Sequence, residues 1–468
     1  MSKKDLLSLS QQVIETETKE VEQQDSSIIG KSFVKKDSLV KVTGEARFAS
    51  DYKFDGMLYG GVFRSTVPHA TIKSLDLSKA KAHPGVACVL TYEDIPGINR
   101  TGIIIKDEPC LVDDKVRRIG DAIAILAADT EEHLAEALEL IEIEYELIEP
   151  VFSVEHALEA DSPKVHGTTN IHGEKHLFTG DVEAAFKECD VIVENTYRSS
   201  LITHMFIEPE AGISRYEDNI LTVYCTTQNP HYDRDDVARV MGLPRNAVRV
   251  VQTTTGGGFG GKLDLSVQCH LALLTYYTKK PVRMVRSRTE STVVSAKRHP
   301  LVMKAKTGAT KDGRVLATEV YITGDTGAYA SYGPAVITRS VVHATGPYYI
   351  PNVKVDAVFV YTNNPMSGAF RGFGCPQISI CHEGQMNALA KALNMDPVEL
   401  RILNAHEVGS RIATGQVLDQ SVGFKETLIQ ADAKAREMLS SYGKSIRYEF
   451  EGDVSGDKDD AQDMEGSV

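Results

Sequence analysis

The stretch TTTGGGFGGKLDL, residues 253–265, constrains this chain more than any other. Five of the six residues from Gly256 to Gly261 are glycine, and Phe259 interrupts them. Glycine lets the backbone adopt positive φ and lets a ligand approach the main chain closely. The run AVRVVQTT before the loop is typical of a strand, and LSVQCHLALLTYY after it is typical of a helix. Because unpaired N–H groups at a helix N-terminus suit phosphate or an oxo group, the stretch predicts an anion or cofactor site.

Two nucleotide-binding patterns overlap this loop. Residues 256–262 satisfy G-x-x-x-x-G-K, but a P-loop places Ser or Thr next, for magnesium, and Leu263 stands there. Residues 256–261 also fit G-x-G-x-x-G, but a dinucleotide-binding fold places an acidic residue about 20 residues further on. The chain there reads KKPVRMVRSRTES, which is basic. Two interpretations stay open from these residues alone: a loop that contacts a metal cofactor through main-chain N–H groups, and a glycine-rich turn around a core phenylalanine.

Composition and charge restrict the classes of protein. The chain has 468 residues and a net charge of −14, and binding to nucleic acid requires clustered Lys and Arg, so we expect no nucleic-acid partner. We find no run of about 18 apolar residues and no apolar segment near the N-terminus, and therefore expect neither a membrane span nor a secretory signal. Seven scattered cysteines without a C-x-x-C pair argue against a disulfide framework and against a zinc or iron–sulfur site in this chain. A reducing, cytoplasmic location fits these observations.

The chain divides into two folded regions between polar ends. Residues 1–30 predict a flexible extension, and the acidic residues 449–468 predict a disordered tail. Residues 31–155 and 165–440 each mix strand and helix patterns, with a linker around residue 160. The predicted strands span residues 56–63, 85–92, 121–128, 141–148, 190–200, 220–227, 247–254 and 315–325. The predicted helices span residues 130–141, 234–242, 266–279 and 377–394. The fold class is therefore α+β.

Several long motifs, in a fixed order, carry a family resemblance. They are KVTGEARFASDYKFDGMLYGGVFRS (41–65), PGVACVLTYEDIPG (84–97), TQNPHYDRDDVARVMGLPRNAVRVV (227–251), TTTGGGFGGK (253–262), NNPMSGAFRGFGCPQ (363–377) and DPVELRILN (396–404). From about residue 30 to 435 the chain resembles the molybdenum hydroxylases, which include xanthine dehydrogenase, aldehyde oxidase and their bacterial relatives. The resemblance implies an a/b hammerhead domain followed by the first molybdopterin-binding domain.

The resemblance also implies a site. Gln228 would hydrogen-bond a terminal oxo ligand on molybdenum, Phe259 would direct its main-chain N–H toward the cofactor, and Arg371 would contribute main chain near the metal. These three are the expected catalytic and metal-contacting residues. Without the resemblance, Gln228 would be interpreted as an ordinary strand-end residue and Phe259 as core. The other expected cofactor-binding residues are Gly257, Gly258, Gly260, Ala369 and Phe370.

Three further positions concern the substrate. Phe373 would present one aromatic face to a flat heterocycle. Leu263 stands where xanthine dehydrogenases have a glutamate that hydrogen-bonds the purine, and the loss of such a partner costs about 1–3 kcal/mol. Arg339, 32 residues before Arg371, has the spacing of an arginine of the purine enzymes and would pair with a carboxylate. A structural salt bridge is the alternative for Arg339. The expected substrate is a small N-heterocycle such as nicotinate, ahead of purines and then aldehydes.

The resemblance implies partners as well. The family's catalytic glutamate lies in a G-x-G-E segment of a second molybdopterin-binding domain, and this chain contains no G-x-G-E. We therefore expect the glutamate on a second molybdopterin subunit, as in the split nicotinate dehydrogenase of anaerobes; truncation is the alternative. Water would supply the oxygen, and electrons would pass through a 2Fe-2S subunit and an FAD subunit to NAD(P). The cofactor would be molybdenum-molybdopterin in its cytosine dinucleotide form. A catalytically silent cofactor-assembly homologue is the rival outside enzymes, and the intact Gln228 and both loops argue against it.

Overall fold

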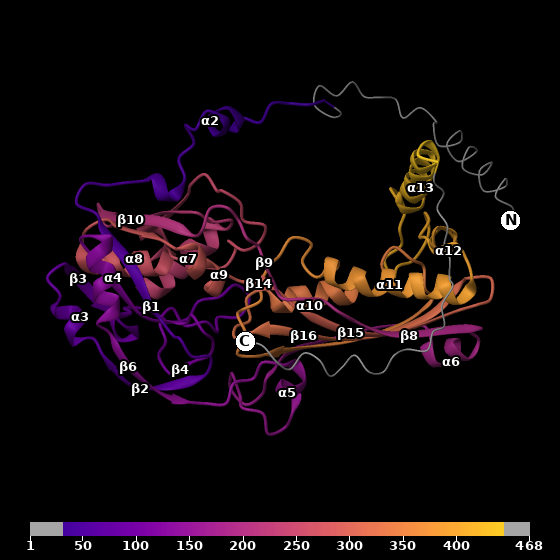
Figure 1. Cartoon of the computed structure of the whole chain (residues 1–468), viewed down its shortest axis with the longest axis horizontal. Helices are drawn as coiled ribbons and strands as arrows, with labels where there is room; N and C mark the ends of the chain where they lie inside the picture. The colour runs from indigo at the N-terminus through magenta and orange to yellow at the C-terminus, as the bar shows by residue number, and fades with distance from the viewer. Residues whose placement is uncertain (1–30, 444–468) are drawn as a thin grey trace. The chain divides into compact units, whose positions relative to one another are not determined.

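The computed structural model describes residues 31–443, so the predicted extension (1–30) and tail (449–468) lie outside the described residues (Figure 1). Residues 31–47 belong to a unit of their own, with one short helix, α2 (Ser38–Val42), in which Lys41 pairs with Asp37. All other elements belong to the unit that begins at Phe48.

A seven-stranded mixed sheet draws its strands from both predicted regions. Its order is β12-β11-β10-β13-β1-β5-β3. The strands are β1 (Leu58–Arg64), β3 (Val86–Leu90), β5 (Ala122–Ala128), β10 (Ala211–Glu217), β11 (Ile220–Cys225), β12 (Val248–Gln252) and β13 (Val282–Val285). The join lies where β1 pairs with β13 in parallel, with Leu58 opposite Val282. One continuous sheet therefore contains strands from both sides of the predicted boundary at residues 155–165. The division of the chain into two domains at this boundary stays a prediction.

Helices cover both faces of this sheet. Consecutive strand residues point to opposite faces. A Cβ on Gly60 would lie 2.9 Å from Leu274 of α8 (Gln268–Thr278), and one on Gly61 would lie 3.1 Å from Leu134 of α4 (Glu131–Glu139). α8 and α4 therefore pack on opposite faces of β1, where glycine lets them approach. α7 (Pro230–Met241) packs beside α8.

The first region adds a small three-stranded sheet, β4-β2-β6, beside this layer. Its strands are β2 (Ala70–Asp76), β4 (Lys115–Val116) and β6 (Glu142–Leu147). The short helices here and in the neighbouring connections are α3 (Ser78–Ala82), α5 (Val154–Leu158), α9 (Arg288–Val294) and the 3₁₀ turns η1 (Ala49–Asp51), η2 (Tyr92–Asp94) and η3 (Arg245–Ala247).

The second region also builds a five-stranded sheet, β7-β17-β16-β15-β8. Its strands are β7 (Ile171–Thr179), β8 (Val191–Arg198), β15 (Leu301–Ala309), β16 (Val315–Gly327) and β17 (Asn352–Tyr361). Ile322 of β16 packs into a cluster with α10 (Gly333–Val342) and α11 (Cys375–Leu393), whereas Ala317 packs on α6 (Val182–Lys187). Figure 1 shows α10 and α11 on one face of the strands and α6 on the other.

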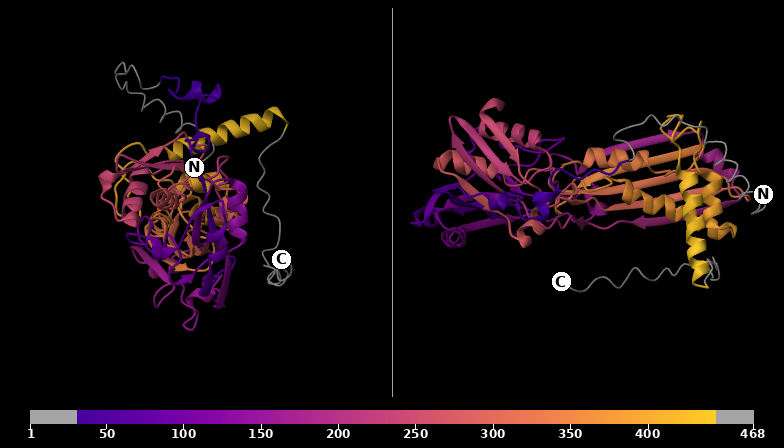
Figure 2. Two further views of the ribbon diagram at one scale, coloured as in Figure 1. Left: turned by 90° about the vertical axis from the view of Figure 1, so that its left-hand side faces the viewer. Right: turned by 90° about the horizontal axis from the view of Figure 1, so that it is seen from above.

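The remaining elements connect or extend these layers. A two-stranded ladder joins β9 (Ile202–Thr203) to β14 (Lys297–Arg298). α12 (Pro397–Asn404) packs on α11 and leads to α13 (Phe424–Ser441), which contains no buried residue and projects from the sheet in Figure 2. No helix within residues 31–443 is long and apolar enough to cross a bilayer.

Each of the predicted strands and helices has a counterpart here. The predicted order of strand, glycine loop and helix is also found, because β12 ends at Gln252 and a helix follows the loop. α8 begins at Gln268, two residues later than predicted, and residues 262–267 separate it from the loop. The physical reason is that Lys262 and Asp264 are both buried side chains with their own polar partners, so the chain turns inward before the helix begins. The N–H groups of the loop are therefore turn amides and not those of a helix terminus.

Candidate functional site

Gln228 and the glycine loop, residues 256–261, leave the sheet at the same edge, because β11 and β12 are parallel neighbours. Gln228 Oε1 accepts hydrogen bonds from the N–H groups of Gly260 (3.0 Å) and Lys262 (3.3 Å). A Cβ on Gly258 would lie 2.4 Å from that oxygen, so only glycine fits there. These bonds fix which end of the amide points inward. The Nε2 group of the exposed Gln228 side chain has no partner within residues 31–443 and is an available donor.

The middle of the loop presents a row of main-chain donors. Phe259 has φ of +54° and its side chain is half exposed. Such a backbone conformation is rare for a bulky residue and costs on the order of 1–3 kcal/mol, so the surrounding contacts must enforce it. The N–H groups of Gly257, Gly258 and Phe259 have no hydrogen-bond partner in the described part of the chain. Three successive free N–H groups could donate to an anionic or oxo group.

A second loop, residues 367–374, is bonded to the first. The N–H of Arg371 donates to the carbonyl of Phe259 (2.9 Å). A Cβ on Gly260 would lie 2.3 Å from the carbonyl oxygen of Ala369, so the two backbones are in direct contact. The carbonyl of Arg371 accepts a hydrogen bond from Arg298 (3.1 Å). Both main-chain polar groups of Arg371 are thus used inside the protein, which leaves its exposed side chain and the shape of the loop for any contact with a cofactor.

Aromatic stacking holds the second loop. Phe370 stacks on His204 with 4.1 Å between ring centroids, and the guanidinium carbon of Arg298 lies 3.9 Å from the Phe370 ring centroid. His204 Nε2 donates to the carbonyl of Ala369 (2.8 Å). Burial lowers the pKa of His204, which keeps the imidazole neutral. Phe370, although expected at the cofactor, is therefore enclosed between two side chains of its own protein.

Charged side chains hold the first loop from below. Lys262 is 1% exposed, and its Nζ donates to Glu208 Oε2 (2.9 Å) and Thr226 Oγ1 (2.8 Å). The same oxygen of Glu208 accepts the N–H of Gly256 (2.7 Å) and the hydroxyl of Thr226 (2.9 Å). Burial lowers the pKa of Lys262, and the bond to Glu208 opposes that effect. One carboxylate oxygen therefore holds both ends of the glycine loop and the strand end that leads to Gln228.

The residues expected at the substrate lie beside the two loops. Phe373 has φ of +53° and is half buried, with its ring edge-on to Tyr332 at 5.6 Å. Tyr332 immediately precedes α10, which carries Arg339 and packs closely against Gly374. The Arg339 side chain is exposed and makes no ion pair with residues 31–443, so the salt-bridge alternative finds no support. Leu263 is half buried and closes the glycine turn by donating its N–H to Gly260 (3.2 Å).

Direct contacts thus join Gln228, the glycine loop and residues 369–371 into one assembly, with Phe373, Arg339 and Leu263 around it. Sequence reasoning missed the side chains that support this assembly: His204, Glu208, Thr226 and Arg298. One signal was present, since a lysine directly after a glycine-rich loop needs a partner if the loop is buried. Nothing in the sequence identifies that partner as Glu208.

The chain is similar to proteins of one family along most of its length. Residues 165–405 match the molybdopterin cofactor-binding domain, and residues 43–149 match the a/b hammerhead domain of aldehyde oxidase and xanthine dehydrogenase. The nicotinate dehydrogenase large molybdopterin subunit of Eubacterium barkeri is 68% identical over 416 residues, covering 89% of this chain and 98% of that relative. The chain belongs to the xanthine dehydrogenase and aldehyde oxidase family. Its predicted family and its fold class, a hammerhead domain followed by a molybdopterin-binding domain, are confirmed.

Other members of the family show the same match over part of their length. The xanthine dehydrogenase molybdenum-binding subunit of Escherichia coli O157:H7 is 31% identical over 408 residues, covering 84% of this chain and 54% of that relative. The aldehyde oxidoreductase of Desulfovibrio gigas superposes with a TM-score of 0.85 and 30% identity, covering 88% of this chain and 47% of that one. The chain spans about half the length of these two relatives and nearly all of the E. barkeri protein. The family members are molybdenum-dependent oxidoreductases, and this chain is a component of an enzyme of that class.

The donor set fits the family's cofactor. Within residues 31–443, Gln228 Nε2 and the N–H groups of residues 257–259 are donors without a partner. Oxo ligands and phosphate-bearing pterin are acceptors, and preorganised donors of this kind are how proteins hold developing or resident negative charge. Glu208, the acidic side chain that binds the loop, lies on its underside, where it contacts Lys262 and Thr226.

Proposed function

We propose that this chain is the molybdopterin-binding subunit of a multi-subunit hydroxylase that acts on a carbon beside the ring nitrogen of an N-heterocyclic acid such as nicotinate. When bound, the molybdenum cofactor would supply the two-electron oxidation of a C–H bond, with water as the source of oxygen. The 68% identity to a nicotinate dehydrogenase subunit supports the reaction class. The guanidinium of Arg339, which is exposed and makes no ion pair with the described residues 31–443, supports an anionic substrate.

The residues of this chain would hold the reactants in place. Gln228 Nε2 and the N–H groups of residues 257–259 would orient the cofactor by hydrogen bonds, and the bond between Arg371 and Phe259 would keep the two loops in register. Phe373, supported edge-on by Tyr332, would offer its ring face to the heterocycle. Arg339 would pair with the carboxylate of the substrate, which a planar guanidinium can bind through two hydrogen bonds.

The rest of the machinery would come from partner chains. These are a second molybdopterin subunit carrying the catalytic glutamate, a 2Fe-2S subunit and an FAD subunit that passes electrons to NAD(P). The cofactor would be the cytosine dinucleotide form, and the assembly would work in the cytoplasm. The name of the E. barkeri relative, a large subunit, supports the expectation of further subunits.

A purine is the second candidate substrate. Arg339 at the spacing of the purine enzymes favours it, as do the relatives named as xanthine dehydrogenases. Leu263 disfavours it, because an apolar side chain there cannot replace a hydrogen bond to the purine. An aldehyde would make no use of Arg339.

Substitution of Arg339 tests the substrate. In the enzyme purified with its partner subunits, Arg339→Met should lower kcat/KM for nicotinate by about 10- to 150-fold, the equivalent of the 1.5–3 kcal/mol of a charged hydrogen bond. The value for neutral nicotinamide should change by less than about threefold. Arg314→Met is the matched control, because Arg314 is also exposed and has no ion pair in the part of the chain that the structure describes. Equal losses for the acid and the amide would contradict the role of Arg339, and activity on hypoxanthine but not nicotinate would favour the purine.

A further inference from the structure

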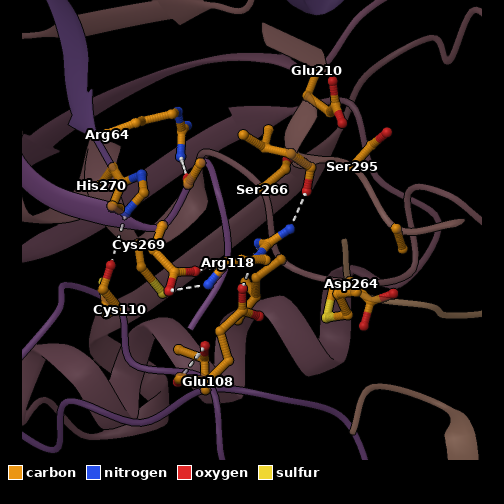
Figure 3. A pocket seen from close by; sticks show the side chains of 18 of the residues that line it. Arg64, Glu108, Cys110, Arg118, Glu210, Asp264, Ser266, Cys269, His270 and Ser295 are labelled. Carbon is orange, nitrogen blue, oxygen red and sulfur yellow. Dashed lines mark hydrogen bonds and ion pairs between the residues drawn. The ribbon is translucent and has the colours of Figure 1, made fainter. Parts of the chain in front are cut away.

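A cavity of about 60 Å³ lies beside the residues that follow the glycine loop, where the two regions meet (Figure 3). The second region contributes residues 264–266 together with Glu210, Cys269, His270, Arg286 and Ser295. The first region contributes Arg64, Glu108, Cys110, Arg118 and Asp121. Gly261, the last residue of the glycine loop, also lines this cavity, whereas none of the residues named singly for the cofactor or the substrate does.

Four buried polar atoms of its lining residues have no hydrogen-bond partner within residues 31–443. They are Asp264 Oδ2, Glu210 Oε2, Arg286 Nε and His270 Nδ1. The four residues are between 1% and 8% exposed, so bulk solvent does not reach these atoms. A buried polar atom without a partner costs about 1–3 kcal/mol of stability. A ligand that hydrogen-bonds to these four atoms would remove that cost.

The other ends of these side chains are fixed, which aims the free atoms. Asp264 Oδ1 accepts the hydroxyl of Ser331 (2.7 Å), and Glu210 Oε1 accepts a guanidinium N–H of Arg286 (3.1 Å). His270 Nε2 donates to the carbonyl of Cys110 (3.1 Å), so Nδ1 of the neutral imidazole is an acceptor. The free set is therefore three acceptors and one donor.

The charge on the walls argues against an ion. Three guanidinium groups face four carboxyl groups on the lining, and protonation of one carboxyl makes the walls neutral. A neutral ligand that both donates and accepts suits this set. At about 30 Å³ for each molecule, the share of one water in the liquid, the cavity has room for about two waters.

We propose that this cavity is a proton-exchanging water site, in which ordered waters bridge Asp264 and Glu210 to Arg286 and His270. Asp264 is the group that takes up the proton. Asp264 lines the cavity, its Oδ2 is buried and has no partner within residues 31–443, and its Oδ1 accepts the Ser331 hydroxyl. The charged groups that interact with Asp264 are Arg118, Asp107 and Glu108 from the first region and Asp233 of α7 from the second. The remaining titratable groups around the cavity are Arg64, Glu108, Cys110, Asp121, Glu210, Cys269, His270 and Arg286.

The electrostatics agree with this geometry. Burial raises the pKa of Asp264 from 3.8 to about 6, opposed by the Ser331 hydrogen bond and Arg118. Burial likewise raises the pKa of Glu108 to about 7, with Arg118 opposing. Water in the cavity favours the ionised form, so the pKa of Asp264 should lie between 3.8 and about 6.

Protonation of Asp264 would affect the residues expected at the substrate through the hydrogen bond between Asp264 and Ser331. Ser331, which Asp264 holds, has φ of +41° and directly precedes Tyr332, whose ring supports Phe373. The water site itself is a property of the fold and does not depend on which heterocycle is the substrate.

A crystal structure of the enzyme with its partner subunits tests the site directly. Crystals soaked separately in bromide and in rubidium should show no anomalous peak in the cavity. Ordered waters should lie about 2.7–3.2 Å from Asp264 Oδ2 and Glu210 Oε2. A bromide peak, a rubidium peak or an empty cavity would each overturn the proposal.

Infrared spectroscopy tests the proton. In the difference between the spectra of the wild-type complex and of Asp264→Asn, a protonated carboxyl band should disappear as the pH rises between 3.8 and about 6. Asp264→Asn should remove that band, and Asp161→Asn, at an exposed aspartate, should leave it unchanged. The same titrating band in Asp264→Asn would refute the assignment. If that variant fails to fold, the soaked wild-type crystals still decide the water site.

The sign of the pH effect on stability follows from the raised pKa. The folded state binds the Asp264 proton more tightly than the unfolded state does. The resulting stabilisation is fully present below about pH 4 and is lost as the pH rises through about 6. The melting temperature of the wild type should therefore fall over this range relative to that of Asp264→Asn, and parallel curves would count against proton uptake by Asp264.

Discussion

The two loops at the candidate site reach a similar backbone conformation by different chemistry. Each contains a phenylalanine with positive φ, Phe259 in the first and Phe373 in the second. The first loop is held from below by a buried ion pair, and the second by stacked rings and a guanidinium. The difference teaches that strain at a site does not require one kind of support, because any sufficiently rigid neighbour can enforce it. The two supports should, however, fail differently when they are broken.

The largest effect, on stability and molybdenum content together, is expected from the ion pair. Lys262→Met would leave the largely buried carboxylate of Glu208 without its ammonium partner, which costs up to about 3 kcal/mol of unfolding free energy. The variant should also lose molybdenum when the complex is purified, because both ends of the glycine loop depend on Glu208. Urea unfolding and metal analysis measure the two effects. Lys311→Met, at an exposed lysine, should change the unfolding free energy by no more than about 0.5 kcal/mol. It should leave the molybdenum content unchanged.

The contact between the loops comes next. Gly260→Ala would press a methyl group against the carbonyl of Ala369, adding about 1–3 kcal/mol of overpacking to about 1–2 kcal/mol of backbone strain. Gly409→Ala is the matched control, since Gly409 also has positive φ, +91°, but open space around its Cβ position. Gly409→Ala should therefore show only the stability loss that comes from the positive φ. Equal losses in melting temperature for the two variants would mean that the loops can separate without cost.

Loss of the aromatic support should cost less. Phe370→Leu removes the stack on His204 and the contact with Arg298, worth about 1–2 kcal/mol together. Phe152→Leu, at an exposed phenylalanine, provides the baseline in the same thermal denaturation experiment. A loss as large as that of Lys262→Met would show that the two supports are energetically equivalent.

The smallest effect is expected at Phe259. Phe259→Gly relieves the positive φ but adds chain entropy to the unfolded state, so the unfolding free energy should change by less than about 1 kcal/mol. Phe373→Gly removes a ring that packs on the buried cluster beneath α10 and should cost about 3 kcal/mol. Denaturant titration of both variants compares them, and similar losses would show that Phe259 is anchored as firmly as Phe373.

The sequence was most informative where a rare residue pattern carries the structure. The glycine loop and Gln228 were predicted to lie together, and the hydrogen bonds from Gly260 and Lys262 to Gln228 join them. Strands such as β5 and helices such as α11 have clear periodicity and were predicted. α10 was not, because it begins with Gly-Pro and contains several β-branched residues, so its helix depends on packing against the five-stranded sheet.

The side chains that support the two loops could not be predicted, because each contacts a loop that lies far from it in the sequence. His204 and Phe370 are 166 positions apart, and Glu208 meets Lys262 across 54. A single histidine or glutamate carries no pattern of its own, and only the tertiary structure brings each to its loop. The orphaned atoms of the water cavity are of the same kind, since Glu210, Asp264 and His270 become a site only when two regions enclose them.

The seven-stranded sheet has a consequence for how this protein is made. β1 lies between β5 and β13, and Leu58 pairs with Val282 of β13. During synthesis, β1 therefore has only one of its two neighbouring strands until β13 has been made. A ribosome therefore releases the first region long before that region can complete its sheet, and the exposed edge of β1 is available to any other strand meanwhile. Contacts so distant in sequence slow folding. The β1 edge of the first region therefore stays without its native neighbour until β13 has been synthesised.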